Sequence, residues 1–350
     1  MNTSNTSEIL FITGAAGYVG AMLCDQFHDR PNVAKIIALD KNPMPDLLKG
    51  KSKIVWINAN TSDTTWQELV TSHAPTVVIH TAWQIREMYG KKETQWKWNV
   101  TGSRTIFDFA FNTPSVRKLI HFSTASGYGA FPTNTLEHFF KEDEVLREDT
   151  YLYGIEKIQA ERELEAAYAE ARSREGAHVP QVFVVRPAAL TGPRGRYMFK
   201  RFGLQSVLRK GLPIIPIANN IWCRQFIHED DVCDIVDLLT FKQLEGKYEV
   251  FNITPNSIVL AHDMAEVMKK KTFRITPTIV RMTFFVLWHL SRGKIPVSKG
   301  GWRFYSYPIV MDGTKLTQKY GYKYKFESRA ALEKKEGRYA KYIPQEELSQ

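Results

Sequence analysis

A strand-length apolar run leads directly into a glycine-rich turn, and this junction constrains the fold more than any other feature. The run is Ile9–Thr13, and the residues after it read Gly14-Ala-Ala-Gly17-Tyr-Val-Gly20. Glycines at this spacing permit a tight turn, a close approach of backbone to a pyrophosphate, and close packing of the next helix on the strand. The free N–H groups at the start of that helix favour phosphate. The junction therefore predicts a strand–turn–helix unit that holds a dinucleotide.

Five further apolar runs follow, separated by amphipathic stretches. They are Ile36–Leu39, Ile54–Ile57, Val77–His80, Leu119–Phe122 and Val182–Val185. Their continuous, β-branched character is typical of parallel strands buried on both faces. The longest stretches between them, Thr94–Phe111 and Leu152–Arg174, have helical patterning. This alternation predicts an α/β fold with a doubly wound parallel sheet.

The alternation of strands and helices ends after Arg186, where Gly and Pro become frequent. The segment Tyr248–Thr254 is predicted to be a further strand of the sheet. From about Pro255 the chain is expected to be helical, basic and aromatic. We expect residues 1–186 plus about 225–255 to form a dinucleotide-binding domain. Residues from about 187 to 224 plus 256–350 are expected to form a smaller, mostly helical substrate-binding lobe, because 350 residues exceed what one compact core usually fills.

The charge is distributed unevenly along the chain. There are 47 Lys and Arg against 37 Asp and Glu, a net charge of +10. Residues 267–350 hold 18 basic and 6 acidic residues, or +12, which leaves −2 for the first 266. Such an excess is typical either of a surface for anions or of a well-solvated basic lobe. With 43% hydrophobic and 24% charged residues, the composition excludes a disordered, collagen-like or coiled-coil chain.

The cysteine content and the hydrophobic segments indicate in which cellular compartment the protein is expected. Three cysteines, none in a CxxC pair, favour a reducing interior. The segment Met1–Ser7 is polar and does not resemble a signal peptide, and Phe284–Trp288 is too short to span a membrane. We therefore expect a cytoplasmic protein with no integral membrane segment. No motif indicates nucleic-acid binding, and no metal site is expected.

A carboxylate is expected beside the cofactor. Asp40 ends the second predicted strand, 26 residues after Gly14. A carboxylate there accepts hydrogen bonds from both ribose hydroxyls of the adenosine half and repels a 2′-phosphate. The residue favours NAD over NADP, although the neighbouring Lys41 leaves NADP open.

A tyrosine and a lysine four residues apart open the second long helix. This spacing puts Tyr153 and Lys157 on one helical face. An ammonium group close to a phenol lowers the phenol pKa, which makes tyrosine a usable proton shuttle near neutral pH. The hydroxyl cluster in Phe122–Gly129 follows a predicted strand, at the sheet edge where substrates sit.

These motifs, in this order over about residues 8–255, resemble the extended short-chain dehydrogenase/reductases, the NAD-dependent epimerase/dehydratase group with a Rossmann fold. The resemblance places NAD against Gly14, Ala16, Gly17, Tyr18, Val19, Gly20, Asp40, Asn60, Thr61, Thr81, Ala82, Trp83, Asn99, Ser123, Tyr153, Lys157 and Pro187, and substrate against Ser126, Ala189 and Arg224. Two positions depart from the family pattern. Asn60 stands where an aspartate is usual, and Trp83 is unusually bulky.

The resemblance implies hydride exchange at a secondary alcohol or ketone. Tyr153 would move the hydroxyl proton, Lys157 would hold the ribose and tune Tyr153, and Thr124 would align the reacting oxygen, with Ser123 or Ser126 as alternatives. Ala125 follows Thr124 where sugar dehydratases carry an acid, so that reaction is not expected. Epimerase and dehydrogenase both remain open, and a non-catalytic dinucleotide-sensing protein is the alternative of a different class.

The resemblance leaves two substrate classes open. Arg224 stands where nucleotide-sugar enzymes bind a diphosphate, which favours that class slightly. Ala189 replaces the asparagine usual in such enzymes, and the apolar stretch Ile279–Leu290 suits a steroid-like or other apolar alcohol. The helices predicted at Thr94–Phe111 and Leu152–Arg174 form an intersubunit bundle in related proteins, so a homodimer is expected.

Overall fold

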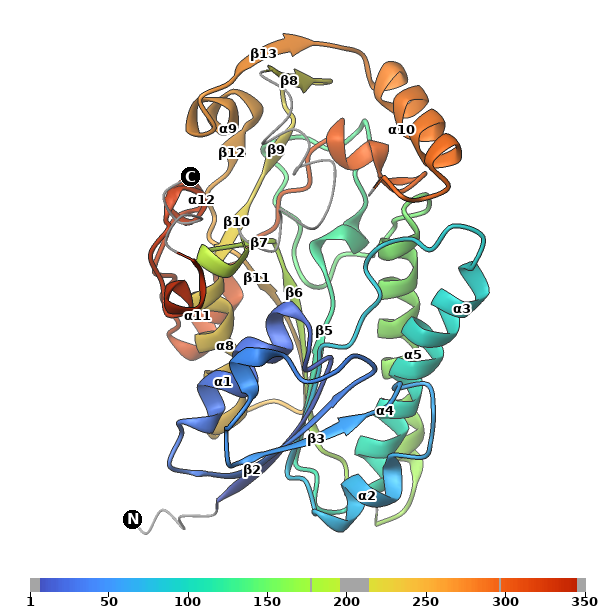
Figure 1. Cartoon of the computed structure of the whole chain (residues 1–350), viewed down its shortest axis with the longest axis vertical. Helices are drawn as coiled ribbons and strands as arrows, with labels where there is room; N and C mark the ends of the chain where they lie inside the picture. Colours follow the sequence, from blue (N-terminus) through green and yellow to red (C-terminus); the bar gives the residue numbers. More distant parts are fainter. Residues whose placement is uncertain (1–6, 177, 196–213, 296, 345–350) are drawn as a thin grey trace.

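A seven-stranded parallel sheet forms the centre of the computed structural model, which describes residues 7–176, 178–195, 214–295 and 297–344 (Figure 1). Its strands are β1 (Glu8–Thr13), β2 (Val33–Asp40), β3 (Ile54–Asn58), β4 (Val77–His80), β5 (Lys118–Phe122), β6 (Gln181–Pro187) and β11 (Tyr248–Ile253). They lie in the order β3-β2-β1-β4-β5-β6-β11, and every adjacent pair is parallel. The six predicted runs and the predicted return near residue 250 are confirmed as strands of a doubly wound sheet.

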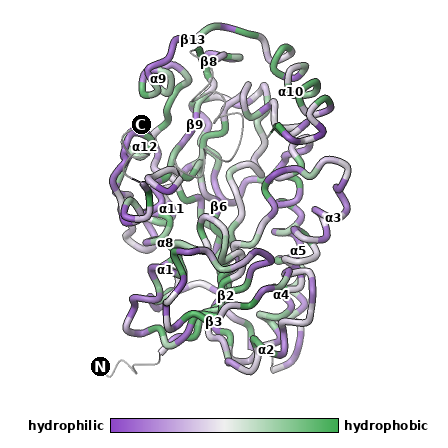
Figure 2. Tube along the Cα trace, in the orientation of Figure 1, coloured by the Kyte–Doolittle hydropathy of each residue, from purple (hydrophilic) through white to green (hydrophobic). Residues whose placement is uncertain are grey.

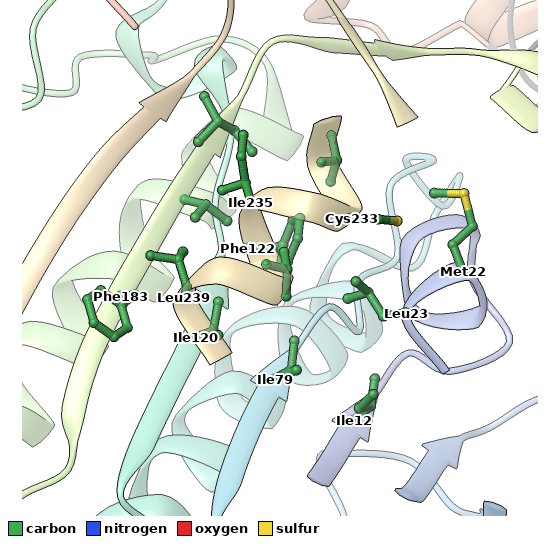
Figure 3. Packing of buried hydrophobic residues seen from close by; sticks show 14 of the residues in the cluster. Ile12, Met22, Leu23, Ile79, Ile120, Phe122, Phe183, Cys233, Ile235 and Leu239 are labelled. Atoms are coloured by element: carbon green, nitrogen blue, oxygen red, sulfur yellow. The ribbon is translucent and has the colours of Figure 1, made fainter. Parts of the chain in front are cut away.

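Helices cover both faces of this sheet. Helices α1 (Tyr18–His28) and α8 (Glu229–Phe241) lie on one face, and α2 (Gln67–Ser72), α4 (Gly102–Asn112) and α5 (Leu152–Ser173) lie on the other. Successive strand residues point to opposite faces, so Ile12 joins the core with α1 while Phe11 joins the core with α4. Figure 3 shows strand side chains such as Ile120 packed with Leu239 of α8. Full burial of each such side chain contributes about 1.5–3 kcal/mol.

The helix predicted at Thr94–Phe111 carries an irregularity. It consists of α3 (Lys92–Trp96), a π-helical turn at Lys97–Thr101 and α4, without a break between them. Such π segments inside helices are frequent at functional sites. Here the turn contains Asn99, which is buried. The second predicted helix is confirmed as α5.

Within the described ranges, the second part of the molecule holds three small two-stranded sheets. They pair β7 (Ala189–Thr191) with β10 (Phe226–His228), β9 (Cys223–Arg224) with β12 (Val259–Leu260), and β8 (Ile214–Ile217) with β13 (Lys271–Arg274). The later helices are α9 (Ala261–Val267), α10 (Pro277–Ser291), α11 (Thr314–Tyr320) and α12 (Ser328–Glu333), with a 3-10 helix, η4 (Gly301–Tyr305). The chain after residue 255 therefore contains strands β12 and β13 as well as helices. Residues 196–213 of the predicted lobe, and the first six residues, lie outside the described ranges.

The C-terminal segment packs beside the central sheet. Ile309, Met311 and Leu316 join the same hydrophobic core as α1 and α8. The hydroxyl of Tyr339 is buried and donates to the carbonyl of Met22 at 2.8 Å. Residues 309–343 thus share the core of the dinucleotide-binding half, and the expected two-domain division stays a prediction. No helix in the described ranges is long and apolar enough to cross a membrane.

Candidate active site

The glycine-rich turn lies where the strand order reverses, between β1 and β4. Gly14 has a φ of +71°, and a Cβ there would lie 2.6 Å from the backbone of Ala82. A Cβ at Gly17 would lie 2.9 Å from the carbonyl oxygen of Gly14, and one at Gly20 would overlap the same oxygen. Helix α1 begins immediately after Gly17 and has no side-chain cap. The turn therefore offers bare backbone and a helix N-terminus, which suit a pyrophosphate.

Asp40 lies at the edge of this turn. One carboxylate oxygen accepts the Ala16 N–H at 3.0 Å, and the other accepts the backbone and side-chain N–H groups of Asn42 at 2.8 and 3.0 Å. These bonds fix the carboxylate beside the glycines, where the adenosine ribose of a dinucleotide fits. The neighbouring Lys41 is engaged elsewhere, with its ammonium 3.8 Å from the centre of the Trp98 ring.

Three predicted cofactor residues shape the surrounding loops. The side chain of Asn60 accepts hydrogen bonds from the backbone and hydroxyl of Ser62, both at 3.1 Å. Thr61 is buried against Gly102, and the Thr81 hydroxyl donates to the carbonyl of Thr13 at 2.7 Å. The Asn60 and Thr81 side chains bond to protein groups and Thr61 packs closely against Gly102, so these residues position the loops around the crevice.

Lys157 and Tyr153 lie together on α5, as their spacing predicts. The ammonium of Lys157 is buried, donates to the carbonyl of Phe122 and lies 3.6 Å from the centre of the Trp83 ring. The same ring meets Tyr153 edge-on, with centroids 6.4 Å apart. Burial lowers the pKa of Lys157 to about 7, against the opposing effect of Glu161 and Glu156.

The expected lowering of the Tyr153 pKa is not seen in this structure. Burial raises the pKa of Tyr153, and hydrogen bonding to Thr124 opposes that rise. Burial also leaves Lys157 partly deprotonated near neutral pH. Its reduced positive charge therefore does not offset the desolvation of the phenol. A tuning role for Lys157 thus stays a proposal for the cofactor complex.

The hydroxyl cluster after β5 divides into two environments. Ser123 donates to the Glu161 carboxylate, which also accepts two hydrogen bonds from Arg186 at 3.0 and 2.6 Å. Thr124 instead accepts the Ser126 N–H at 3.1 Å and interacts with Tyr153. Ser123 is therefore part of a buried ion-pair network, and Thr124 is the hydroxyl beside the tyrosine.

Sequence reasoning missed a buried carboxylate, Glu156, which comes between Tyr153 and Lys157 in the sequence of α5. Glu156 accepts hydrogen bonds from Gln95 at 3.0 Å and Asn99 at 2.7 Å, and burial raises its pKa. The Asn99 amide in turn bonds both backbone groups of Gln84. The signal in the sequence was a charged residue three positions after Tyr153, on a helix face that had to be buried.

A second missed carboxylate joins the glycine turn to the chain after β7. Glu229 accepts the Tyr18 hydroxyl and the N–H groups of Arg194 and Gly195, the last two at 3.1 and 2.9 Å. Burial raises the pKa of Glu229 to about 7. The carboxylate thus links helix α1 to the segment after β7.

The remaining predicted residues lie along the crossover into the second part. Pro187 ends β6, and Ala189 begins β7, opposite Phe226. The guanidinium of Arg224 lies 4.9 Å from the centre of the Trp222 ring and 5.9 Å from that of Tyr305.

Among the described residues, Arg224 donates to two backbone carbonyls, those of Phe304 and Cys223. Desolvation lowers its pKa, but arginine keeps its charge, and within the described ranges no carboxylate forms an ion pair with it. A half-buried cation without a described anion is a candidate site for one supplied by substrate.

Solved structures share this fold. UDP-glucose 4-epimerase from Thermotoga maritima, with UDP-glucose, aligns with a TM-score of 0.70 at 21% identity, covering 93% of this chain and 96% of that one. dTDP-glucose 4,6-dehydratase from Bacillus anthracis, in complex with NAD, aligns with a TM-score of 0.69 at 16% identity, covering 93% and 94%. At these identities the likeness shows the fold alone.

Sequence comparison identifies relatives and a family. An uncharacterized protein of Mycobacterium tuberculosis strain H37Rv is 22% identical over 333 residues, covering 93% of this chain and 82% of that protein. A decarboxylating sterol-4-alpha-carboxylate 3-dehydrogenase of Candida albicans is 24% identical over 299 residues, covering 80% of each. The family model described as NAD dependent epimerase/dehydratase matches residues 10–254. The chain, with its glycine turn, Asp40 and paired Tyr153 and Lys157, therefore belongs to the NAD-dependent epimerase/dehydratase family.

Proposed function

We propose that this protein is an NAD-dependent oxidoreductase or epimerase that acts at a secondary alcohol or ketone. The observation that carries the proposal is the meeting of Thr124, Tyr153 and Lys157 at the sheet edge next to the glycine turn. The glycine turn and Asp40 would hold the dinucleotide, whose nicotinamide supplies the hydride acceptor. The family assignment supports this class of chemistry.

The roles follow from the contacts. Tyr153 takes the hydroxyl proton of the substrate as its carbon is oxidised and returns it in the reverse direction. Thr124 hydrogen-bonds the tyrosine and aligns the reacting oxygen. Lys157, held against Trp83 and the Phe122 carbonyl, binds the nicotinamide-side ribose and stabilises the phenolate.

For the substrate we propose a nucleotide-sugar-like molecule with a diphosphate. The support is Arg224, a half-buried guanidinium that no described carboxylate neutralises. An incoming diphosphate would gain charge-assisted hydrogen bonds there.

An apolar, steroid-like alcohol is the second candidate. Aromatic rings wall the same region, with Tyr151 packed between Tyr153 at 5.6 Å and Phe304 at 5.1 Å. Ala189 also lacks the amide that sugar-binding relatives use there. The name of the Candida albicans relative agrees with this alternative.

The test is a paired substrate screen. The protein is incubated with NAD and either UDP-glucose, UDP-galactose and UDP-glucuronic acid or a set of sterol alcohols. Nicotinamide reduction and product masses are measured, with Tyr153→Phe as the inactive control. The nucleotide sugars are also separated by chromatography, because an epimer has the same mass as its substrate and forms without net reduction of NAD. Arg224→Met should raise KM for a diphosphate substrate and leave KM for a sterol unchanged. Tight NAD binding without turnover of either class would indicate a dinucleotide-sensing protein instead.

The state of the cofactor separates the two reactions. An epimerase completes its cycle without net oxidation, so it can retain NAD through purification. A dehydrogenase exchanges NAD at every turnover. Mass spectrometry of the denatured protein, purified without added cofactor, distinguishes them.

A further inference from the structure

Helix α10 is apolar on two opposite faces, and only one of them is covered. Val280, Phe284 and Trp288 are buried against the neighbouring chain. The other face is exposed, and Figure 2 shows α10 as a largely hydrophobic helix at the edge of the molecule. Its apolar side chains and their exposed fractions are Ile279 48%, Met282 62%, Phe285 50%, Val286 47% and Leu290 81%. A helix with apolar residues all round is expected inside a core or in lipid, so the open face calls for a partner.

The neighbouring strands extend this open face. Phe273 on β13 is 50% exposed, and β13 leads directly into α10. Ile214 on β8, the strand paired with β13, is 37% exposed. We call the exposed apolar side chains of α10 together with Phe273 and Ile214 the α10 surface.

Positive charge surrounds the α10 surface. Residues 267–311 contain five lysines and four arginines and no aspartate or glutamate, a net charge of +9. Lys271 and Arg274 are exposed just before α10, and Arg292 and Lys294 are exposed just after it. The apolar face is thus bordered by cations at both ends.

We propose that the α10 surface docks this protein on an anionic lipid surface. A helix of 15 residues is about 22 Å long, too short to cross the roughly 30 Å hydrocarbon core. Lying in the plane of the interface, it would place its apolar side chains at the acyl boundary and the flanking cations among the headgroups. Lysine and arginine side chains near an anionic surface add electrostatic attraction to the burial of apolar area.

Charge favours lipid over a second copy of the chain. A two-fold contact would set each α10 surface against its equivalent. The cations around the two surfaces would then face each other. Residues 267–311 contain no aspartate or glutamate that could offset them, and like charges across an interface are unfavourable.

Docking would bring the membrane close to the candidate substrate region. Phe284, on the covered face of α10, contacts Tyr305 with ring centroids 5.1 Å apart, and Tyr305 borders Arg224. Only two side-chain layers therefore separate the lipid-facing side of α10 from Arg224. The proposal concerns a surface and does not depend on which substrate the site takes.

The experiment is vesicle flotation of the full chain. Phosphatidylcholine vesicles are compared with vesicles in which about one lipid in three is phosphatidylglycerol, an anionic surface of the kind that attracts basic segments. The unmodified protein should float with the anionic vesicles and be released by high salt. The double variant Phe285→Ser and Leu290→Ser should bind anionic vesicles at least about tenfold more weakly, because it lacks two apolar side chains that would be buried in the lipid. Lys271→Glu with Arg274→Glu should do the same.

Matched controls remove equivalent side chains elsewhere. Leu69→Ser with Val145→Ser changes residues that are 48% and 79% exposed, close to the values for Phe285 and Leu290. Lys49→Glu with Lys242→Glu makes the same change of charge on exposed lysines of other elements. Both controls should float as the unmodified protein does, and NAD affinity should be equal in all variants, which shows that they are folded.

Three results would overturn the proposal. The first is absence of flotation with anionic vesicles, and the second is flotation that the α10 variants leave unchanged. The third is a self-association, detected by light scattering, that only the α10 variants abolish, because the surface would then join two copies of the chain.

Discussion

Substitution of the two adjacent hydroxyls after β5 should separate a catalytic role from a structural one. Thr124→Val keeps the side-chain shape and removes the hydroxyl that interacts with Tyr153. Loss of one positioned hydrogen-bonding group at a reacting oxygen typically costs about 10²-fold in turnover. NAD affinity should stay unchanged, because the Thr124 hydroxyl otherwise accepts only the Ser126 N–H in this structure.

Ser123→Ala should have the opposite profile. It deletes one hydrogen bond to the buried Glu161 carboxylate but leaves both bonds from Arg186 in place. A hydrogen bond to a charged group contributes about 1.5–3 kcal/mol, so the free energy of unfolding should fall by that amount. Turnover should stay within about twofold of the unmodified enzyme, since no reacting group is lost.

Urea unfolding followed by tryptophan fluorescence measures the free energy of unfolding, and steady-state kinetics on the substrate found by the screen measures turnover. If Ser123→Ala abolished turnover without loss of stability while Thr124→Val remained active, the assignment of the two hydroxyls would be reversed.

Three further predictions concern the cofactor, the lysine and assembly. NAD should bind more tightly than NADP, and Asp40→Ala should reduce that preference; equal calorimetric affinities in the unmodified protein would contradict the role of the carboxylate. The buried Lys157, with a pKa of about 7, is neutral above that pH while the unfolded chain stays protonated, so the unfolded state binds more protons and stability rises with pH. Relative to Lys157→Met, the unmodified protein should therefore gain roughly 2–3 kcal/mol of unfolding free energy between about pH 7 and pH 9 in urea titrations, and no gain would refute the shift. A homodimer formed through α4 and α5 should persist at micromolar concentrations in light scattering, where a monomeric mass would exclude it.

The sheet could be predicted from the sequence because its determinants are local. Each of the six runs is long enough and apolar enough to be recognised alone, and the glycine turn follows the first run directly. The strands β12 and β13 are different, because β12 has only two residues and β13 has no buried side chain. All four residues of β13 are exposed, so no buried periodicity marked it.

The site could be predicted only as far as spacing determines it. The positions of Tyr153 and Lys157 follow from helix geometry. Which hydroxyl faces the tyrosine depends on the direction of two adjacent side chains at a strand end, and that was set by the Arg186–Glu161 pair elsewhere in the core. The link between Tyr18 and Glu229 joins residues 211 positions apart, and no local pattern contains it.

The central claim is that Tyr153 carries the proton in a hydride-transfer reaction. Tyr153→Phe removes only the phenolic hydroxyl, so the test is to measure turnover and NAD affinity of this variant beside the unmodified protein. We predict unchanged NAD affinity and a fall in turnover of about 10²–10⁴, the usual share of general acid–base catalysis. Near-full turnover by Tyr153→Phe on an identified substrate would contradict it.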